Sequence, residues 1–176
     1  MKRHLLYLCL LLSAHTAFAA TPADTTGTWI DQLRILRDAI YHRDKATTKT
    51  FFTFPFKDDQ FWAFTATNLY DKKSPVTEQL FDRYFDKIFP KQFIDAFLKI
   101  KTKQLYETGE DQTRLQTDDQ KESYLLTANY DKTEQTVSLS YIVNIKDKEE
   151  PIEYAITYIF KIVKGKLKFD HSFMAG

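Results

Sequence analysis

The candidates for acid–base chemistry outside the first thirty residues are two histidines, His42 and His171. His42 ends an apolar helical pattern, and we interpret it as a surface residue at the negative end of the helix dipole. His171 alternates with Leu167 and Phe169, so we expect its side chain on the apolar face of a strand. There it is either a general base in a pocket or a core histidine. Asp170 falls on the opposite face, so we do not expect it to pair with His171.

Three tyrosines are candidates to bind a ligand together with His171. Tyr141, Tyr154 and Tyr158 occupy apolar positions of two alternating segments. If their rings line a cavity, the hydroxyl groups could orient a ligand, but the same positions also suit ordinary core residues. The sequence therefore proposes a ligand-binding set of His171, Tyr141, Tyr154 and Tyr158, and it leaves both interpretations open.

Carboxylates offer a second route to chemistry, because Asp82 and Asp86 lie four residues apart on one face of a predicted helix. Such a pair suits a metal ion or acid–base work, but Arg83 and Lys87 beside it favour simple surface charge. The four glycines are isolated from one another, which excludes a glycine-rich phosphate loop. We therefore predict no catalytic residue, no metal site and no cofactor.

The N-terminal residues have the pattern of a secretory signal peptide. Lys2 and Arg3 precede an apolar run over residues 5–12, and a small-x-small cleavage site ends at Ala19. The run is too short to span a bilayer, and the one cysteine, Cys9, lies inside it, so we predict neither a membrane anchor nor a disulfide. We expect a periplasmic or extracellular protein with a signal peptide over 1–19, a flexible lead-in over 20–27 and a single domain over 28–176.

Charge argues against a nucleic-acid partner. Loss of Lys2 and Arg3 with the signal peptide would change the formal net charge from +1 to −1. A surface that binds phosphates needs a strong local excess of basic groups, which this balance does not provide. The lysines between residues 91 and 103 alternate with apolar residues at helical spacing, which is typical of the solvent face of an amphipathic helix.

Hydrophobic periodicity predicts helices first and strands later. Apolar residues recur every three or four positions over 29–42, 76–89 and 91–101, and Asp44 is placed to cap a short helix over 45–52. A short strand is predicted over 60–67. The polar, acidic residues 107–121 are expected to form an exposed loop.

The last third of the chain alternates apolar and polar residues. Because the links between its alternating segments are short, neighbouring strands must be antiparallel. We therefore predict an α+β fold in which N-terminal helices pack on a C-terminal four-stranded antiparallel curved sheet. The predicted strands are 124–130, 137–145, 152–162 and 167–173.

This order of elements resembles the nuclear-transport-factor-2-like (cystatin-like) α+β superfamily. The likeness lies in the first helix, in Asp44 with a short helix ending at Phe54-Pro55-Phe56, and in the terminal run of antiparallel strands. It implies a bent sheet that wraps the first helix and often leaves a pocket between them. Isomerases, dehydratases, small-molecule binders and interaction domains share this fold, so the resemblance does not select a function.

Three functions remain open from the sequence, and one of them is a structural role in envelope assembly. The first is an exported, non-enzymatic protein that contacts a protein partner in the cell envelope, such as an inhibitor or an immunity factor that blocks a toxin. Its contact surface would be either the acidic residues 107–121 or an exposed aromatic cluster of Phe54, Phe56, Phe61 and Trp62. The alternative for this aromatic cluster is burial against the sheet. The second is a pocket for a small apolar ligand, with isomerase-like or dehydratase-like activity implied by the resemblance.

Overall fold

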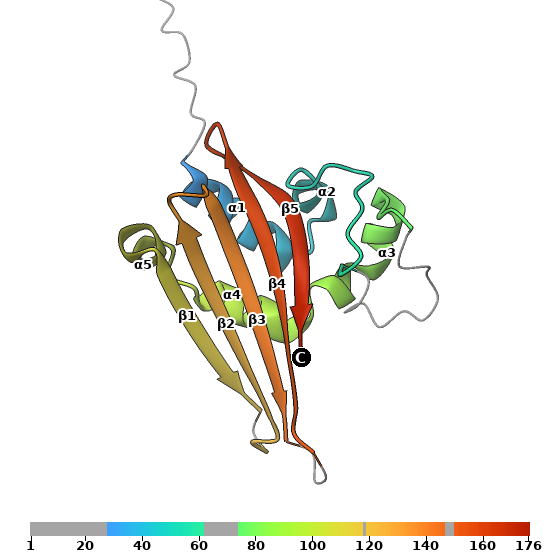
Figure 1. Ribbon diagram of the computed structural model, residues 1–176, viewed down its shortest axis with the longest axis vertical. Coiled ribbons are helices and arrows are strands. Elements are labelled where there is room, and N and C mark those ends of the chain that lie inside the picture. The colour runs from blue at the N-terminus through green and yellow to red at the C-terminus, as the bar shows by residue number, and fades with distance from the viewer. Residues whose placement is uncertain (1–27, 62–73, 118, 147–149) are drawn as a thin grey trace, which may run out of the picture.

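The computed structural model describes residues 28–61, 74–117, 119–146 and 150–176. In these residues the chain is α+β, with helices preceding strands (Figure 1). The helices are α1 (Trp29–Tyr41), α2 (Lys45–Lys49), α3 (Glu78–Ile88), α4 (Lys91–Lys99) and α5 (Thr102–Thr108). The strands are β1 (Glu110–Gln116), β2 (Glu122–Asp131), β3 (Thr136–Ile145), β4 (Ile152–Val163) and β5 (Lys166–Ala175).

The sheet has five strands in the order β1-β2-β3-β4-β5, each antiparallel to its neighbour. The prediction of four strands was wrong because residues 110–116, expected to belong to an exposed loop, form β1 and pair with β2 along their whole length. β1 is an edge strand whose residues are nearly all polar. Asp111 is the one residue of β1 that is buried. It therefore lacks the apolar alternation by which a strand is recognised.

Buried polar contacts hold this unexpected strand in place. The carboxylate of Asp111 accepts a hydrogen bond of 2.6 Å from the backbone N–H of Lys101, at the start of α5. The hydroxyl of Thr102 accepts a bond of 3.0 Å from Arg34 of α1. These contacts join α1, α5 and β1 at the corner where residues 107–121 had been expected to lie open in solvent.

Capping residues set the start of the first two helices. Thr28 and Asp31 form a reciprocal capping box at the beginning of α1, and the hydrogen bond from the Thr28 hydroxyl lowers the pKa of Asp31. The side chain of Asp44 accepts a bond from the N–H of Thr47, so it caps α2 as the sequence predicted.

The core lies between the helices and one face of the sheet. Leu33, Leu36 and Ile40 of α1 are at most 1% exposed, and they belong to the same buried cluster as the inner residues of the sheet. In the part of the chain that the structure describes, side chains therefore fill the space between α1 and the sheet, where the superfamily resemblance had implied a pocket.

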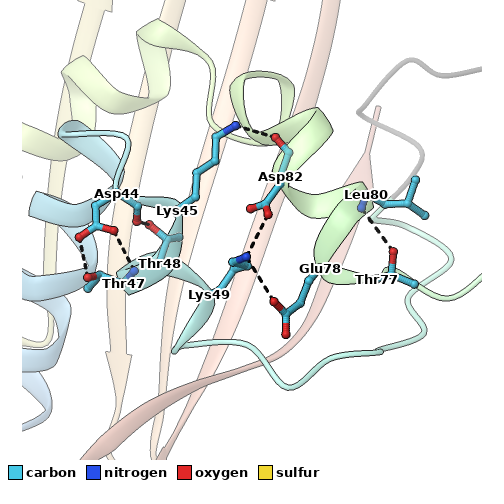
Figure 2. Close-up of polar contacts among 9 residues, drawn as sticks. All are labelled: Asp44, Lys45, Thr47, Thr48, Lys49, Thr77, Glu78, Leu80 and Asp82. Atoms are coloured by element: carbon cyan, nitrogen blue, oxygen red, sulfur yellow. Dashed lines mark hydrogen bonds and ion pairs between the residues drawn. The ribbon is translucent and has the colours of Figure 1, made fainter.

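An ion-pair network attaches α2 to α3. Figure 2 shows Lys45 and Lys49 directed from α2 toward Asp82, where Lys49 Nζ lies 2.9 Å from the carboxylate and Lys45 Nζ donates to the backbone oxygen at 2.7 Å. Asp86, one turn further along α3, pairs with Arg43. The Asp82 hydrogen bond raises the pKa of Lys49. Cations of the chain itself thus neutralise the carboxylate pair that the sequence had offered as a candidate metal site.

Asp58 joins the turn at residues 59–61 to β5. One carboxylate oxygen accepts bonds from the N–H and the hydroxyl of Ser172 at 2.6 and 2.8 Å. The other accepts from the N–H groups of Gln60 and Phe61 at 3.0 and 3.1 Å. Residues 59–61 form a turn, and the rest of the strand predicted over 60–67 lies outside the described residues.

Replacement of Asp58 by alanine should lower the free energy of unfolding by roughly 1.5–3 kcal/mol, because it leaves partly buried donors unpaired. Urea denaturation of the variant measures the loss. Asp59→Ala is the matched control, since Asp59 is exposed, and it should change the stability by less than about 0.5 kcal/mol. Equal stability of the two variants would contradict the role given to Asp58.

Candidate functional site

His171 lies on the outer face of the sheet, so the expectation that it points toward the core was wrong. A β-bulge causes the change: Phe160 pairs with Phe169 but Ile159 pairs with His171, which leaves Asp170 as an extra residue. Beyond the bulge Ser172 becomes the buried residue, and His171 is exposed. The sequence shows no sign of the bulge, because the alternation of apolar residues looks continuous across it.

The bulge also brings Asp170 and His171 together, which the sequence had not predicted. His171 Nδ1 lies 2.8 Å from one oxygen of Asp170, and Lys161 Nζ lies 2.9 Å from the other. Partial burial raises the pKa of Asp170, but the bonds to Lys161 and His171 outweigh it and the net pKa is lowered. The three side chains form a surface ion network on β4 and β5, away from the inner face.

Tyr158 lies in the core, so its side chain is not exposed on the sheet surface. Its ring is 1% exposed, and its hydroxyl donates a hydrogen bond of 2.6 Å to the backbone oxygen of Ile88, the last residue of α3. Burial raises its pKa strongly. Tyr158 therefore attaches the end of α3 to the middle of β4.

Tyr141 and Tyr154 do meet at a groove, and Tyr124 of β2 joins them. The groove lies between the inner face of β2, β3 and β4 and the α3–α4 corner. The lower ends of these strands extend past α4 in Figure 1. It has a volume of about 420 Å³. Its sheet side includes Glu122, Tyr124, Tyr141, Val143, Tyr154 and Ile156, and its helix side includes Asp86, Lys87, Pro90 and Gln92. We call it the tyrosine groove.

Two rings of the tyrosine groove, those of Tyr124 and Tyr141, are held by each other and by α4. The rings of Tyr124 and Tyr141 are nearly parallel, at 4°, with centroids 5.9 Å apart. Phe93 of α4 meets Tyr141 edge-on at 5.6 Å. Tyr124 also donates a hydrogen bond to the carboxylate of Glu122, the first residue of β2. A site with such preset side chains loses little conformational freedom when it binds.

The hydroxyl groups of the tyrosine groove stay protonated at neutral pH. Burial, followed by the bond to Glu122, raises the pKa of Tyr124 to about 12. Burial also raises the pKa of Tyr141 and of Tyr154. These phenols can donate hydrogen bonds and present ring faces, but they are poor bases and poor nucleophiles.

Sequence reasoning found Tyr141 and Tyr154 but missed Tyr124 and Glu122. Tyr124 has the same parity as the buried residues Leu126 and Ala128, so the signal for an inner-facing tyrosine was present. The missing information was the register: Tyr124 pairs with Val143, and Val143 pairs with Tyr154, which places the tyrosines on one face of three adjacent strands. Short alternating segments do not reveal that alignment.

The predicted aromatic contact surface is mostly packed inside. Phe61 is fully buried, so it cannot belong to an exposed surface. Phe54 and Phe56 are half-buried against the core, with centroids 5.3 Å from Phe81 and 5.1 Å from Phe169 respectively. Trp62 lies outside the described residues. The described members of this cluster therefore agree with the alternative that the sequence left open, burial against the sheet.

The described part of the chain contains no cluster of metal-binding side chains and no membrane-spanning helix. No group of three or more histidine, cysteine, aspartate or glutamate side chains there is arranged to hold a metal ion. None of the described helices combines the length and the apolar character needed to cross a bilayer. His42 follows the end of α1 as an exposed residue, where the sequence placed it.

Comparisons of the chain with models of protein families, with curated proteins and with solved structures find no match.

Replacement of Tyr158 by phenylalanine should lower the free energy of unfolding by about 1–3 kcal/mol, because the buried oxygen of Ile88 would lose its donor. Urea denaturation provides the measurement. Tyr41→Phe is the control: Tyr41 is 49% exposed, and the loss of its hydroxyl should be almost neutral. A Tyr158→Phe variant as stable as the parent would show that the bond does not hold α3 to the sheet.

The tyrosine groove also predicts a loss of stability in alkali. The pKa of Tyr124 is about 12 in the folded protein, and an unfolded tyrosine titrates near 10. As the pH rises, Tyr124 therefore loses its phenolic proton at a lower pH in the unfolded state than in the folded state. The free energy of unfolding should fall as pH rises from about 10 toward about 12. Tyr124→Phe should show a shallower fall in urea titrations across this range. A variant with the parent's pH profile would contradict the environment assigned to Tyr124.

Proposed function

We propose that the protein is an exported, non-enzymatic binding protein that acts by contact with another protein through the tyrosine groove. The observation that carries the proposal is the groove itself, which is lined by tyrosine side chains whose hydroxyl groups remain protonated at neutral pH. Such groups recognise a ligand without transferring protons to it. The signal-peptide pattern of residues 1–19 supports export.

Tyrosine is well suited to contact with a protein surface. Its ring gives a large contact area with few rotatable bonds, and its hydroxyl adds a directed hydrogen bond. Tyrosines are correspondingly common among the residues that dominate interface energies. The groove gathers three of them on adjacent strands, with Tyr154 half-buried at its surface.

The rim of the groove favours a protruding segment of a partner over an enclosed small molecule. Asp86 and Lys87 on the helix side are exposed, and Glu122 and Gln92 are half-buried. Small-molecule sites usually enclose most of their ligand. A volume of about 420 Å³ would still accommodate a small apolar ligand, which is the second candidate function.

A partner in the cell envelope follows from the export proposal. An inhibitor or a toxin-immunity factor would use its groove in this way, receiving a loop of the protein that it blocks. We also propose that the chain shares the nuclear-transport-factor-2-like fold. The placement of helices on one face of an antiparallel sheet supports this proposal (Figure 1).

Differential capture from an envelope extract of the producing organism tests the proposed function. Three baits are compared: the parent protein, Tyr154→Ala and Phe173→Ala. Phe173 is the matched control, since it is an aromatic residue that is 44% exposed on the outer face of the sheet. The parent and Phe173→Ala should retain one stoichiometric partner that Tyr154→Ala loses at least tenfold. Circular dichroism and urea denaturation confirm that each bait is folded.

Two results would overturn the proposal. The same proteins recovered with all three baits would show that the groove is not the contact. A small molecule that copurifies with the parent and not with Tyr154→Ala, detected by native mass spectrometry in the absence of a protein partner, would establish the second candidate function instead.

A further inference from the structure

We infer that the tyrosine groove holds a basic side chain of its partner, a lysine or an arginine, with the carboxylate of Glu122 as counter-ion. This inference rests on the proposed function and names the chemical group that the groove selects. It follows from the charge of Glu122, from the partners of the neighbouring charges and from the rings beside it.

Glu122 forms no ion pair with a cation of the described chain. Its side chain is half-buried at the start of β2, and one of its oxygens accepts the hydroxyl of Tyr124. Among the described residues it takes part in no ion pair, and the adjacent Lys121 pairs instead with Asp119 at 3.4 Å. A partly desolvated carboxylate without a cation is unfavourable, so a cation from outside would be stabilised there.

The other charges of the groove have partners away from Glu122. Asp86 pairs with Arg43 beyond the helix side of the groove. The ammonium of Lys87 lies 5.9 Å from the ring centroid of Tyr84, on its own helix. Lys87 lines the same groove, but among the described residues it forms no ion pair with Glu122, so Glu122 has no cation in direct contact at the tyrosine end.

The rings and the apolar floor suit the rest of a basic side chain. The ring of Tyr154, which is half-buried at the groove, can attract a cation through its quadrupole, and phenolic oxygens can accept hydrogen bonds from an ammonium or a guanidinium. Val143 and Ile156 also line the groove, and they can pack against the methylene stem of the basic side chain. An acidic side chain would meet the carboxylate of Glu122, and a short apolar one would leave that charge unpaired.

Titration with short peptides tests the inference directly. The probes are acetyl-Gly-Gly-X-Gly-Gly-amide peptides in which X is lysine, arginine, norleucine or glutamate, and binding is followed by shifts of the protein's NMR signals. Norleucine keeps the methylene stem of lysine and removes its charge. Lysine and arginine peptides should bind at least tenfold more tightly than the norleucine peptide, and the glutamate peptide most weakly. Added salt should reduce the difference.

Two variants that each remove one negative charge show whether Glu122 causes the preference for a basic side chain. Glu122→Gln should abolish the preference for lysine over norleucine. Glu153→Gln removes an exposed charge from the outer face of β4 and should keep the preference. If norleucine and lysine peptides shift the groove signals with equal affinity, the inference is wrong while the groove remains a binding site. If no peptide shifts the groove signals, the inference fails, and the capture experiment still decides the proposed function.

Discussion

The hydrogen bond from the hydroxyl of Tyr158 to the carbonyl of Ile88 joins the helical layer to the sheet. It holds the end of α3 against the middle of β4, and Pro90 then starts α4 in a new direction. On one side of this contact, the side chains of α1 and of the sheet form a continuous core. On the other side, the ends of β2, β3 and β4 extend past α4, and the tyrosine groove lies between them and the α3–α4 corner (Figure 1).

The same face of the sheet therefore serves two purposes. Tyr158 and Tyr154 have the same parity on β4, yet one is 1% exposed in the core and the other is half-buried in the groove. Burial raises the pKa of both phenols, which keeps them protonated. In the core the proton completes a structural hydrogen bond, and in the groove we propose that it is donated to a ligand. The proposed recognition would thus depend on the position of the helices as much as on the tyrosines themselves.

The sequence predicted those parts of the fold in which one periodicity runs without interruption. The spacing of apolar residues located α1, α3, α4 and the last four strands to within a few residues. It failed for β1, whose polar residues are held by the buried contact of Asp111 and by pairing with β2. It failed for His171 because a bulge of one residue reverses the direction of every later side chain. Tyr141 and Tyr154 were identified from parity alone, whereas Glu122 and Tyr124 depend on register between strands.

Photo-crosslinking in living cells tests the central claim, that the inner-face groove is the contact with a partner. A photoreactive phenylalanine analogue replaces Tyr154 in one variant and Phe173, on the opposite face, in another. The structure predicts that irradiation joins the Tyr154 variant to one defined protein of the envelope and leaves the Phe173 variant unlinked. An adduct formed from position 173 and absent from position 154 would contradict the account.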